Sequence, residues 1–165
     1  MKIGIYVAHD DDSIIGVGGT IINRLKLGDE IYIVIFTDGQ NSHTESFEIQ
    51  ANPNPQEVKE KRRKEIENAI NVLGLKKDCL TFLNQIDAAG DCWKDDKDLF
   101  EKVLSITNKE KPDQIYYHYQ LDNHVDHRAV SEIFSKVFRE LDSPVEAYQF
   151  PVWGKIENPD IVCNI

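Results

Sequence analysis

Residues 2–19 read KIGIYVAHDDDSIIGVGG and set the pattern for the whole chain. Residues 2–7 are mostly apolar, which predicts a buried strand, and four ionisable residues at 9–12 end that run. From Ile14 onward, apolar and small residues follow the spacing of a helix. A buried strand that leads through a polar turn into a helix is the opening unit of a parallel α/β sheet.

The same alternation of apolar runs and amphipathic stretches continues along the chain. It predicts strands at residues 2–7, 30–36, 79–83, 114–118 and 146–150, with a sixth at 161–164 left open. It predicts helices at residues 14–27, 56–73, 97–108 and 125–141. We therefore expect a single domain over residues 1–165 with a Rossmann-like three-layer α/β sandwich fold, in which helices flank a mostly parallel sheet of five or six strands. A long segment at 38–55 predicts a lid, a binding loop or disorder.

The composition is that of a soluble globular protein, with 41% hydrophobic and 29% charged residues among 165. The formal net charge of −10 would repel nucleic-acid phosphates and an anionic membrane surface, so we expect neither as a partner. The first residues lack the features of a signal peptide, and no apolar run approaches the roughly 20 residues that span a bilayer. The three cysteines show neither zinc-binding nor disulfide spacing. A cytoplasmic location is the resulting expectation.

Polar and charged residues gather where the predicted strands end. Residues 9–12 follow the first strand, and TDG at 37–39, NQIDAAGD at 84–91 and YQLDNHVDH at 119–127 follow the next three. In an open parallel sheet, ligands bind beyond the carboxyl ends of the strands. We therefore expect these segments to meet at one edge of the sheet and to form a single site.

Two of these segments carry residues with metal-ligand spacing. His9 and Asp12 are three positions apart across a turn, and His124 and His127 are three apart at the start of a predicted helix. One histidine and one carboxylate from the first pair, with one histidine from the second, make the three-ligand set of an open zinc site. Two plainer interpretations stay open. Residues 10–13 could do no more than cap the helix, and His124 and His127 could be surface residues at the start of a helix.

Four motifs along the chain occur in the same order as in a known family. They are AHDDD at 8–12, TDG at 37–39, R-x-x-E at 62–65 and KPDQIYYHYQLDNHVDHRAV at 111–130. They resemble the PIG-L/LmbE family of zinc-dependent N-acetylglucosaminyl deacetylases, whose first motif reads A-H-P-D-D-E and whose later motif reads H-x-D-H. The resemblance covers most of the chain. It implies a Zn²⁺ cofactor and a hydrolase that removes the N-acetyl group from a small amino sugar or its conjugate.

The resemblance implies that His9, Asp12 and His127 hold the zinc ion. This chain departs from the family pattern at two places in the first motif. Asp10 stands where the family has proline, and Ser13 stands where it has glutamate. The extra acidic group leaves either of the two residues before Asp12 as an alternative ligand.

The resemblance also implies the groups that move protons. Asp11 would be the general base that takes a proton from the attacking water. His124 would stabilise the oxyanion of the tetrahedral intermediate or protonate the leaving amine. Asp126 would orient His124.

Weaker signals concern the substrate. Matches to family positions assign substrate contacts to Arg62 and Asp87, and Arg128 could contact an anionic group of the substrate. For each of the three a purely structural role is the alternative. Trp93 could stack on a sugar ring, although a lone tryptophan is more often a packing anchor. His118, at the end of the fourth predicted strand, has no partner that the sequence identifies.

Two other functions remain as alternatives to a sugar deacetylase: a metal-dependent amidase that acts on a non-sugar amide, and a catalytically degenerate α/β protein that binds a small ligand. The GVGG at 16–19 falls inside a predicted helix, so it favours close helix–sheet packing over a dinucleotide site. The family pattern continues beyond the point that corresponds to Ile165. We therefore expect one wall of the site to come from further residues or from a partner subunit, and a homo-oligomer is one alternative.

Overall fold

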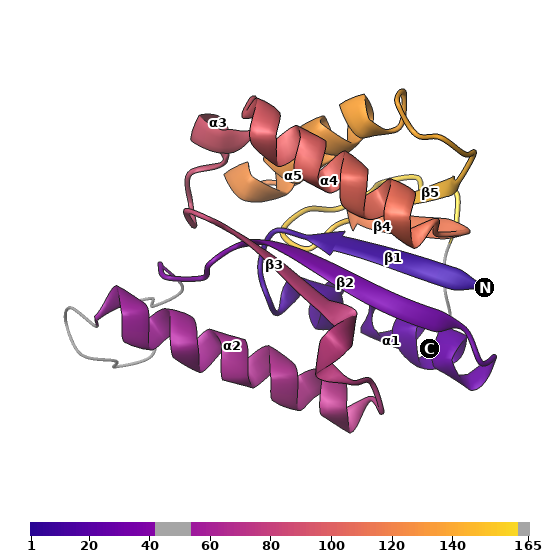
Figure 1. The fold of residues 1–165 in the computed structure, drawn as a ribbon, viewed down its shortest axis with the longest axis horizontal. Coiled ribbons are helices and arrows are strands. Elements are labelled where there is room, and N and C mark those ends of the chain that lie inside the picture. The colour runs from indigo at the N-terminus through magenta and orange to yellow at the C-terminus, as the bar shows by residue number, and fades with distance from the viewer. Residues whose placement is uncertain (42–53, 162–165) are drawn as a thin grey trace.

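The structure, a computed structural model, describes residues 1–41 and 54–161. Five parallel strands form one sheet in the order β3-β2-β1-β4-β5 (Figure 1). They are β1 (Lys2–Val7), β2 (Glu30–Thr37), β3 (Leu80–Gln85), β4 (Gln114–His118) and β5 (Glu146–Phe150). These five predicted strands are confirmed. Most of the sixth, at 161–164, and most of the segment at 38–55 lie outside the described residues.

Helices cover both faces of the sheet. α1 (Asp12–Lys26) and α2 (Pro55–Val72) lie on one face, and α3 (Gly90–Trp93), α4 (Lys97–Glu110) and α5 (Val125–Val137) lie on the other (Figure 1). A short 3-10 turn, η2 (Lys77–Cys79), precedes β3. This arrangement is the three-layer α/β sandwich that the alternating pattern predicts. No described helix combines the length and the apolar character that crossing a membrane requires.

The central strand β1 shows how the two cores are divided. Ile3, Ile5 and Val7 pack with α1 and α2, whereas Tyr6 and Ala8 pack with α4 and α5 on the opposite face. This division follows from the two-residue period of a strand, and the run is apolar throughout because both faces are covered. Full burial of a large apolar side chain such as isoleucine contributes roughly 1.5–3 kcal/mol to the stability of the folded state. β1 therefore gives the polar turn after it a rigid support.

The apolar spacing at 125–141 predicts a longer helix than the structure contains. α5 ends at Val137, Phe138 lies in the turn that follows it, and Leu141 lies in the irregular segment after that turn. Both side chains still pack against the core around α4 and α5. The spacing therefore reflects burial, which continues past the last helical residue. The four-residue helix α3 was not predicted because so short a segment has no measurable period.

Close packing of α1 on the sheet depends on Gly16. A Cβ atom added there would overlap the aromatic ring of Phe150 at the end of β5. The prediction that the GVGG segment permits close helix–sheet packing is confirmed at this position. The first turn of α1 is consequently held near the carboxyl ends of the strands.

Candidate metal centre and active site

The polar turn after β1 directs its last aspartate into the protein. Asp12 begins α1 and is almost fully buried, and its Oδ2 atom accepts a hydrogen bond of 2.8 Å from the backbone N–H of His9. Asp11, the residue before α1, makes no side-chain hydrogen bond to the start of the helix. Helix capping alone therefore does not account for this cluster of acidic residues.

Three donor atoms meet at the carboxyl end of β1. Nδ1 of His9, Oδ2 of Asp12 and Nε2 of His127 lie 3.2 Å from one another. Ligands that lie 2.0–2.1 Å from a tetrahedral zinc ion are separated by about 3.3–3.4 Å, so these three atoms can share one ion. Two imidazole nitrogens and one carboxylate oxygen suit zinc and leave a fourth position open.

Carboxylates face the outer nitrogen of both histidine rings. Nε2 of His9 lies 3.1 Å from Oδ1 of Asp87 and 3.2 Å from Oδ2 of Asp126. Nδ1 of His127 lies 3.0 Å from Oδ1 of Asp122. A carboxylate beside one ring nitrogen favours the proton there and frees the lone pair of the other nitrogen. The free lone pairs are then those of His9 Nδ1 and His127 Nε2, the two nitrogens of the triangle.

Asp126 joins three segments of the site. Its carboxylate lies against His9, whereas the sequence analysis paired it with His124; the backbone N–H of Asp126 donates to Nδ1 of His124 at 3.2 Å. The two carboxylate oxygens also accept hydrogen bonds of 2.7 Å from the backbone N–H groups of Ala88 and Gly90. A Cβ atom at Gly90 would lie within 3.0 Å of the backbone of α5. Only glycine therefore lets the loop after β3 approach α5 this closely.

Burial and neighbouring charges set the protonation of the cluster. Burial lowers the pKa of His9, but hydrogen bonds to Asp12 and two further carboxylates outweigh it and hold that pKa well above its usual value. Burial raises the pKa of Asp12, but its close contacts with the imidazoles of His118, His127 and His9 outweigh burial and hold that pKa well below its usual range. A proton on His9 beside an ionised Asp12 is the state expected without a cation, and a divalent cation would displace that proton.

His118, the last residue of β4, belongs to the same cluster. Its side chain is fully buried, and Nε2 accepts a hydrogen bond of 2.9 Å from the backbone N–H of Ala8. The same nitrogen lies 3.2 Å from Oδ2 of Asp12, and the ring stacks on that of His127. Burial lowers the pKa of His118. The sequence analysis found no partner for it, although its place at the end of a strand is the signal used for the other candidates.

Asp122 is a second residue that the sequence analysis did not single out. It is buried and accepts hydrogen bonds from the backbone N–H groups of His124, Val152 and Trp153, in addition to facing His127. Burial raises the pKa of Asp122, but these N–H groups outweigh it and the net shift is downward. Asp122 thus ties the loop before α5 and the segment after β5 to the site.

Arg62 of α2 pairs with the two acidic residues that precede Asp12. Its guanidinium contacts the carboxylate of Asp10, lies 3.0 Å from Oδ1 of Asp11, and lies 3.6 Å from Glu65. Burial raises the pKa of Asp10, and the charge of Arg62 opposes that rise. Asp10 and Asp11 therefore face α2, while Asp12 faces the histidines. This division favours Asp12 among the three aspartates as the metal ligand.

His124 lies beside the triangle at the start of α5 and is half-buried. Its ring centroid is 4.7 Å from that of His9 and 4.8 Å from that of His127. Burial, together with the nearby imidazoles of His9 and His127, lowers the pKa of His124. Because Nδ1 accepts the N–H of Asp126, the proton of the neutral ring belongs on Nε2.

The sequence matches a family model described as PIG-L, GlcNAc-PI de-N-acetylase, over residues 5–138. The chain belongs to the PIG-L family. Deacetylases of this family are metal-dependent, and all three atoms of the triangle lie inside the matched segment. No curated protein sequence matches this chain at a significant level.

Solved structures share the PIG-L fold. N,N'-diacetylchitobiose deacetylase from Pyrococcus horikoshii is 27% identical, with a TM-score of 0.72 over 84% of this chain and 49% of its own. The A40926 pseudoaglycone deacetylase Dbv21 is 20% identical, with a TM-score of 0.72 over 96% of this chain and 69% of its own. GalB, the 4-carboxy-2-hydroxymuconate hydratase of Pseudomonas putida, is 18% identical, with a TM-score of 0.72 over 90% and 65%. This chain spans about half the length of the chitobiose deacetylase.

The weaker substrate candidates of this PIG-L chain have partners inside the protein. Arg62 holds the acidic turn, and Asp87 faces His9 while accepting the backbone N–H of Asn41 at 3.0 Å. Arg128 donates from one guanidinium nitrogen to two backbone carbonyls of the loop before α5, at 2.9 and 2.8 Å. Each of these side chains therefore has a structural role, whatever contact it makes with substrate.

Trp93 is a packing anchor, as the plainer interpretation predicts. Its side chain is buried, its ring packs beside Phe36, and Nε1 donates a hydrogen bond of 3.1 Å to the backbone carbonyl of Ile86. It is thus not exposed to stack on a sugar ring.

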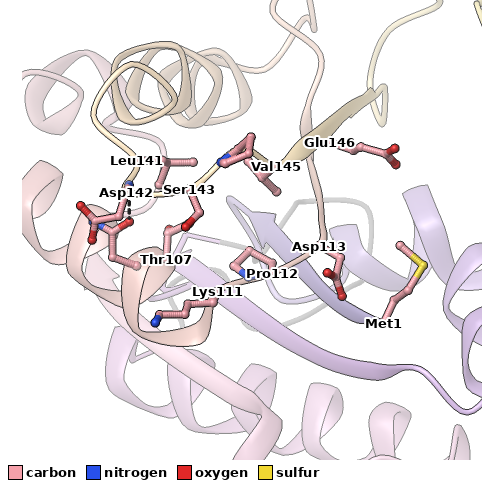
Figure 2. A pocket seen from close by; sticks show the side chains of 12 residues that line it. Met1, Thr107, Lys111, Pro112, Asp113, Leu141, Asp142, Ser143, Val145 and Glu146 are labelled. Carbon is pink, nitrogen blue, oxygen red and sulfur yellow. Dashed lines mark hydrogen bonds between the residues drawn. The ribbon is translucent and has the colours of Figure 1, made fainter.

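A cavity of about 600 Å³ lies at the opposite end of the sheet, where the strands begin (Figure 2). Met1, Lys111, Asp113 and Glu146 are among the residues that line it. It shares no residue with the metal centre, and no group of metal ligands lies among its lining residues in the described part of the chain. The candidate metal centre of this PIG-L chain is therefore identified by its converging ligand atoms and not by this cavity.

Proposed function

We propose that this PIG-L protein is a zinc-dependent hydrolase that removes the N-acetyl group from an N-acetylglucosamine-type amino sugar or its conjugate. The observation that carries the proposal is the triangle of His9 Nδ1, Asp12 Oδ2 and His127 Nε2, whose sides are all 3.2 Å. Membership of the family and the likeness to chitobiose deacetylase support the reaction and the sugar class.

The donor set supports zinc as the cofactor. His9, Asp12 and His127 would hold the ion, and the carboxylates of Asp87 and Asp122 would keep the two rings in the required tautomers. When bound, zinc would polarise the amide carbonyl and lower the pKa of the attacking water to about 7.

Asp11 is the proposed general base. Its side chain is 47% exposed, and Arg62 lies 3.0 Å from Oδ1 and holds the carboxylate at the turn. Asp11 pairs with α2 but keeps part of its carboxylate open to solvent, from which it would reach the attacking water, while its neighbour Asp12 is directed at the histidines. In this role it would take one proton from water as the new C–O bond forms at the amide carbon.

His124 is the proposed proton donor. Its Nδ1 atom is occupied by the N–H of Asp126, so Nε2 presents a proton from the edge of the triangle. That proton would go to the leaving nitrogen as the C–N bond breaks, and acetate and a free amine would result. In the alternative role, His124 would donate a hydrogen bond from Nε2–H to the oxyanion of the tetrahedral intermediate. Asp126 would position His124 through its backbone and His9 through its carboxylate.

Substrate contacts from Arg62, Asp87 and Arg128 remain part of the proposal. A guanidinium carries five N–H donors, and Arg128 uses one nitrogen for its two internal hydrogen bonds. Its other nitrogens would be free to meet a sugar hydroxyl. We also propose that residues 1–165 form one deacetylase-like domain that acts in the cytoplasm on a soluble small molecule, alone or as a homo-oligomer. The single sheet and the net charge of −10 support this.

Two alternatives concern the reaction itself. GalB is named as a hydratase and shares the fold, which means that the fold alone does not select amide hydrolysis. A metal-dependent amidase that acts on a non-sugar amide would use the same three ligands. A catalytically degenerate ligand-binding protein would have the fold without turnover.

One assay separates these functions. The purified protein is loaded with one equivalent of zinc and incubated with a panel of N-acetylglucosamine derivatives and simple N-acetyl amides, and released acetate is measured. Acetate from the sugars that disappears on chelation and in His127→Ala supports the proposal. Acetate from the simple amides alone supports the amidase. Zinc-loaded protein that releases no acetate from any substrate contradicts both.

A further inference from the structure

We propose that His118 is a positioning residue of the metal centre, which seats the ring of His127 and the backbone at Ala8, directly before His9, without binding the ion. This inference rests on the proposed function, because it presumes that His127 and Asp12 hold a metal. It assigns a task to a buried imidazole at the end of β4 that no step of the proposed reaction uses.

Ring stacking is the first contact by which His118 seats His127. The two ring centroids are 3.9 Å apart and the planes differ by 5°. Both side chains are fully buried. Asp122 lies 3.0 Å from Nδ1 of His127 at the edge of the same ring. An imidazole therefore lies against one face of the His127 ring, and a carboxylate lies beside one of its edges.

Stacking also explains why His118 would not be a ligand beside His127. The lone pair of an imidazole nitrogen lies in the ring plane, so a metal ion lies close to the plane of each ring that binds it. The ligand atoms of Asp12, His118 and His127 also lie close together, but the parallel rings of His118 and His127 would direct their lone pairs along separate planes. The ring of His9 is inclined by 56° to that of His127, so those two planes intersect. In addition, the Nε2 lone pair of His118 accepts the N–H of Ala8.

The position of His118 links the segments that supply the ligands. Its Nε2 atom is 2.9 Å from the backbone nitrogen of Ala8, directly before His9, and 3.2 Å from Oδ2 of Asp12. Its ring lies on His127 of α5. One side chain on β4 thus contacts the end of β1, the first turn of α1 and the first turn of α5.

The other ring nitrogen of His118, Nδ1, indicates that the imidazole is not required for packing alone. Nδ1 is buried and has no hydrogen-bond partner among residues 1–41 and 54–161, which makes the folded state less stable than it would be with a satisfied or apolar group. An apolar ring would fill the same space and stack on His127 without that cost. What only the imidazole supplies is the Nε2 atom that accepts the backbone N–H of Ala8, next to His9.

Two variants separate these contributions. His118→Phe keeps a flat ring but removes Nε2, and His118→Gln keeps a polar group of similar reach but removes the ring. We expect each variant to bind Zn²⁺ about 10–100-fold more weakly in competition with a chromophoric chelator. We also expect the visible absorption bands of the Co²⁺-substituted protein to shift. Thr107→Val is the matched control, since Thr107 is equally buried and hydrogen-bonded but contacts Tyr6 and Val103; its zinc affinity and Co²⁺ bands should stay at the wild-type values.

The outcomes distinguish this inference from the proposed function. A wild-type protein that fails to bind zinc contradicts both. A wild-type protein that binds zinc, with both variants equal to it in affinity and spectrum, overturns the role of His118 alone. A measurement that needs no variant is imidazole ¹⁵N NMR of the wild-type protein during zinc addition. Nitrogens of His9 and His127 should shift as ligands while His118 keeps its proton on Nδ1, and a His118 nitrogen that shifts as a ligand would overturn the inference.

Discussion

Nδ1 of His9 and Nε2 of His127 lie 3.2 Å apart, although 118 positions of the chain separate the two residues. The parallel sheet brings them together, because β1 and β4 are hydrogen-bonded neighbours and their carboxyl ends lie at the same edge. His9 directly follows the end of β1, and His127 lies in the first turn of the helix after β4. The two imidazoles are therefore close enough to bind a single metal ion, which is the condition that the metal centre requires.

Replacement of Asp12 by alanine should abolish stoichiometric zinc binding. The substitution removes the carboxylate that contacts all three imidazoles of His9, His118 and His127. Zinc per chain is measured by elemental analysis after dialysis. Asp10→Ala is the matched control, because its carboxylate pairs with Arg62, and it should retain zinc. The reverse pattern, with zinc lost in Asp10→Ala and kept in Asp12→Ala, would show that the wrong aspartate has been chosen.

Replacement of Asp87 or Asp126 by asparagine should weaken zinc binding by about 10–100-fold, since each carboxylate faces Nε2 of His9 and favours the tautomer with a free Nδ1. Chelator competition gives the affinity. Asp91→Asn removes an exposed carboxylate that pairs with Lys94 and should leave the affinity unchanged. Equal affinities in all three variants would mean that neither carboxylate orients the His9 ring.

Replacement of Asp11 or His124 by alanine should preserve zinc and lower turnover. Neither side chain belongs to the triangle, but each is assigned a proton transfer, which contributes about 10²–10⁴-fold to the rate. Zinc content and kcat are measured on the same preparations. Full activity in Asp11→Ala would remove it as the base, and loss of zinc in His124→Ala would make that residue a ligand.

Two glycines of α1 should respond in opposite directions to alanine. At Gly16 the new methyl group would overlap the buried ring of Phe150, and such overpacking costs roughly 1–3 kcal/mol. At Gly18 the nearest atom is 3.8 Å away, so the better helix propensity of alanine should stabilise the fold by roughly 0.5–1 kcal/mol. Urea unfolding of both variants tests this. Stability of Gly16→Ala at or above the wild-type value would mean that α1 does not pack on Phe150 as described.

The fold could be predicted from sequence because both faces of the sheet are buried. The inner strands β1 and β2 are then nearly continuous apolar runs, which mark them without any tertiary information, whereas the edge strands β3 and β5 contain polar and exposed residues. Helix ends were less certain, because an apolar side chain such as Phe138 packs against the core from a turn as well as from a helix. Burial, and not helix geometry, sets that pattern.

The metal centre was predictable only in outline. The spacing of His9, Asp12 and His127 within strand-end motifs pointed to them, but the sequence did not reveal which acidic residue turns inward. That choice depends on Arg62, which reaches the turn from α2, 50 positions after Asp12, and pairs with the other two aspartates. The role of His118 could not be predicted, because its contacts are a backbone N–H and two side chains that are distant in the sequence, and no local sequence pattern indicates such contacts.

X-ray diffraction from crystals of the zinc-loaded protein, recorded on both sides of the zinc absorption edge, tests the central claim most directly. We expect one anomalous peak per chain, within bonding distance of His9 Nδ1, Asp12 Oδ2 and His127 Nε2 together. A zinc peak bonded elsewhere, or no peak among these three atoms, would contradict the account.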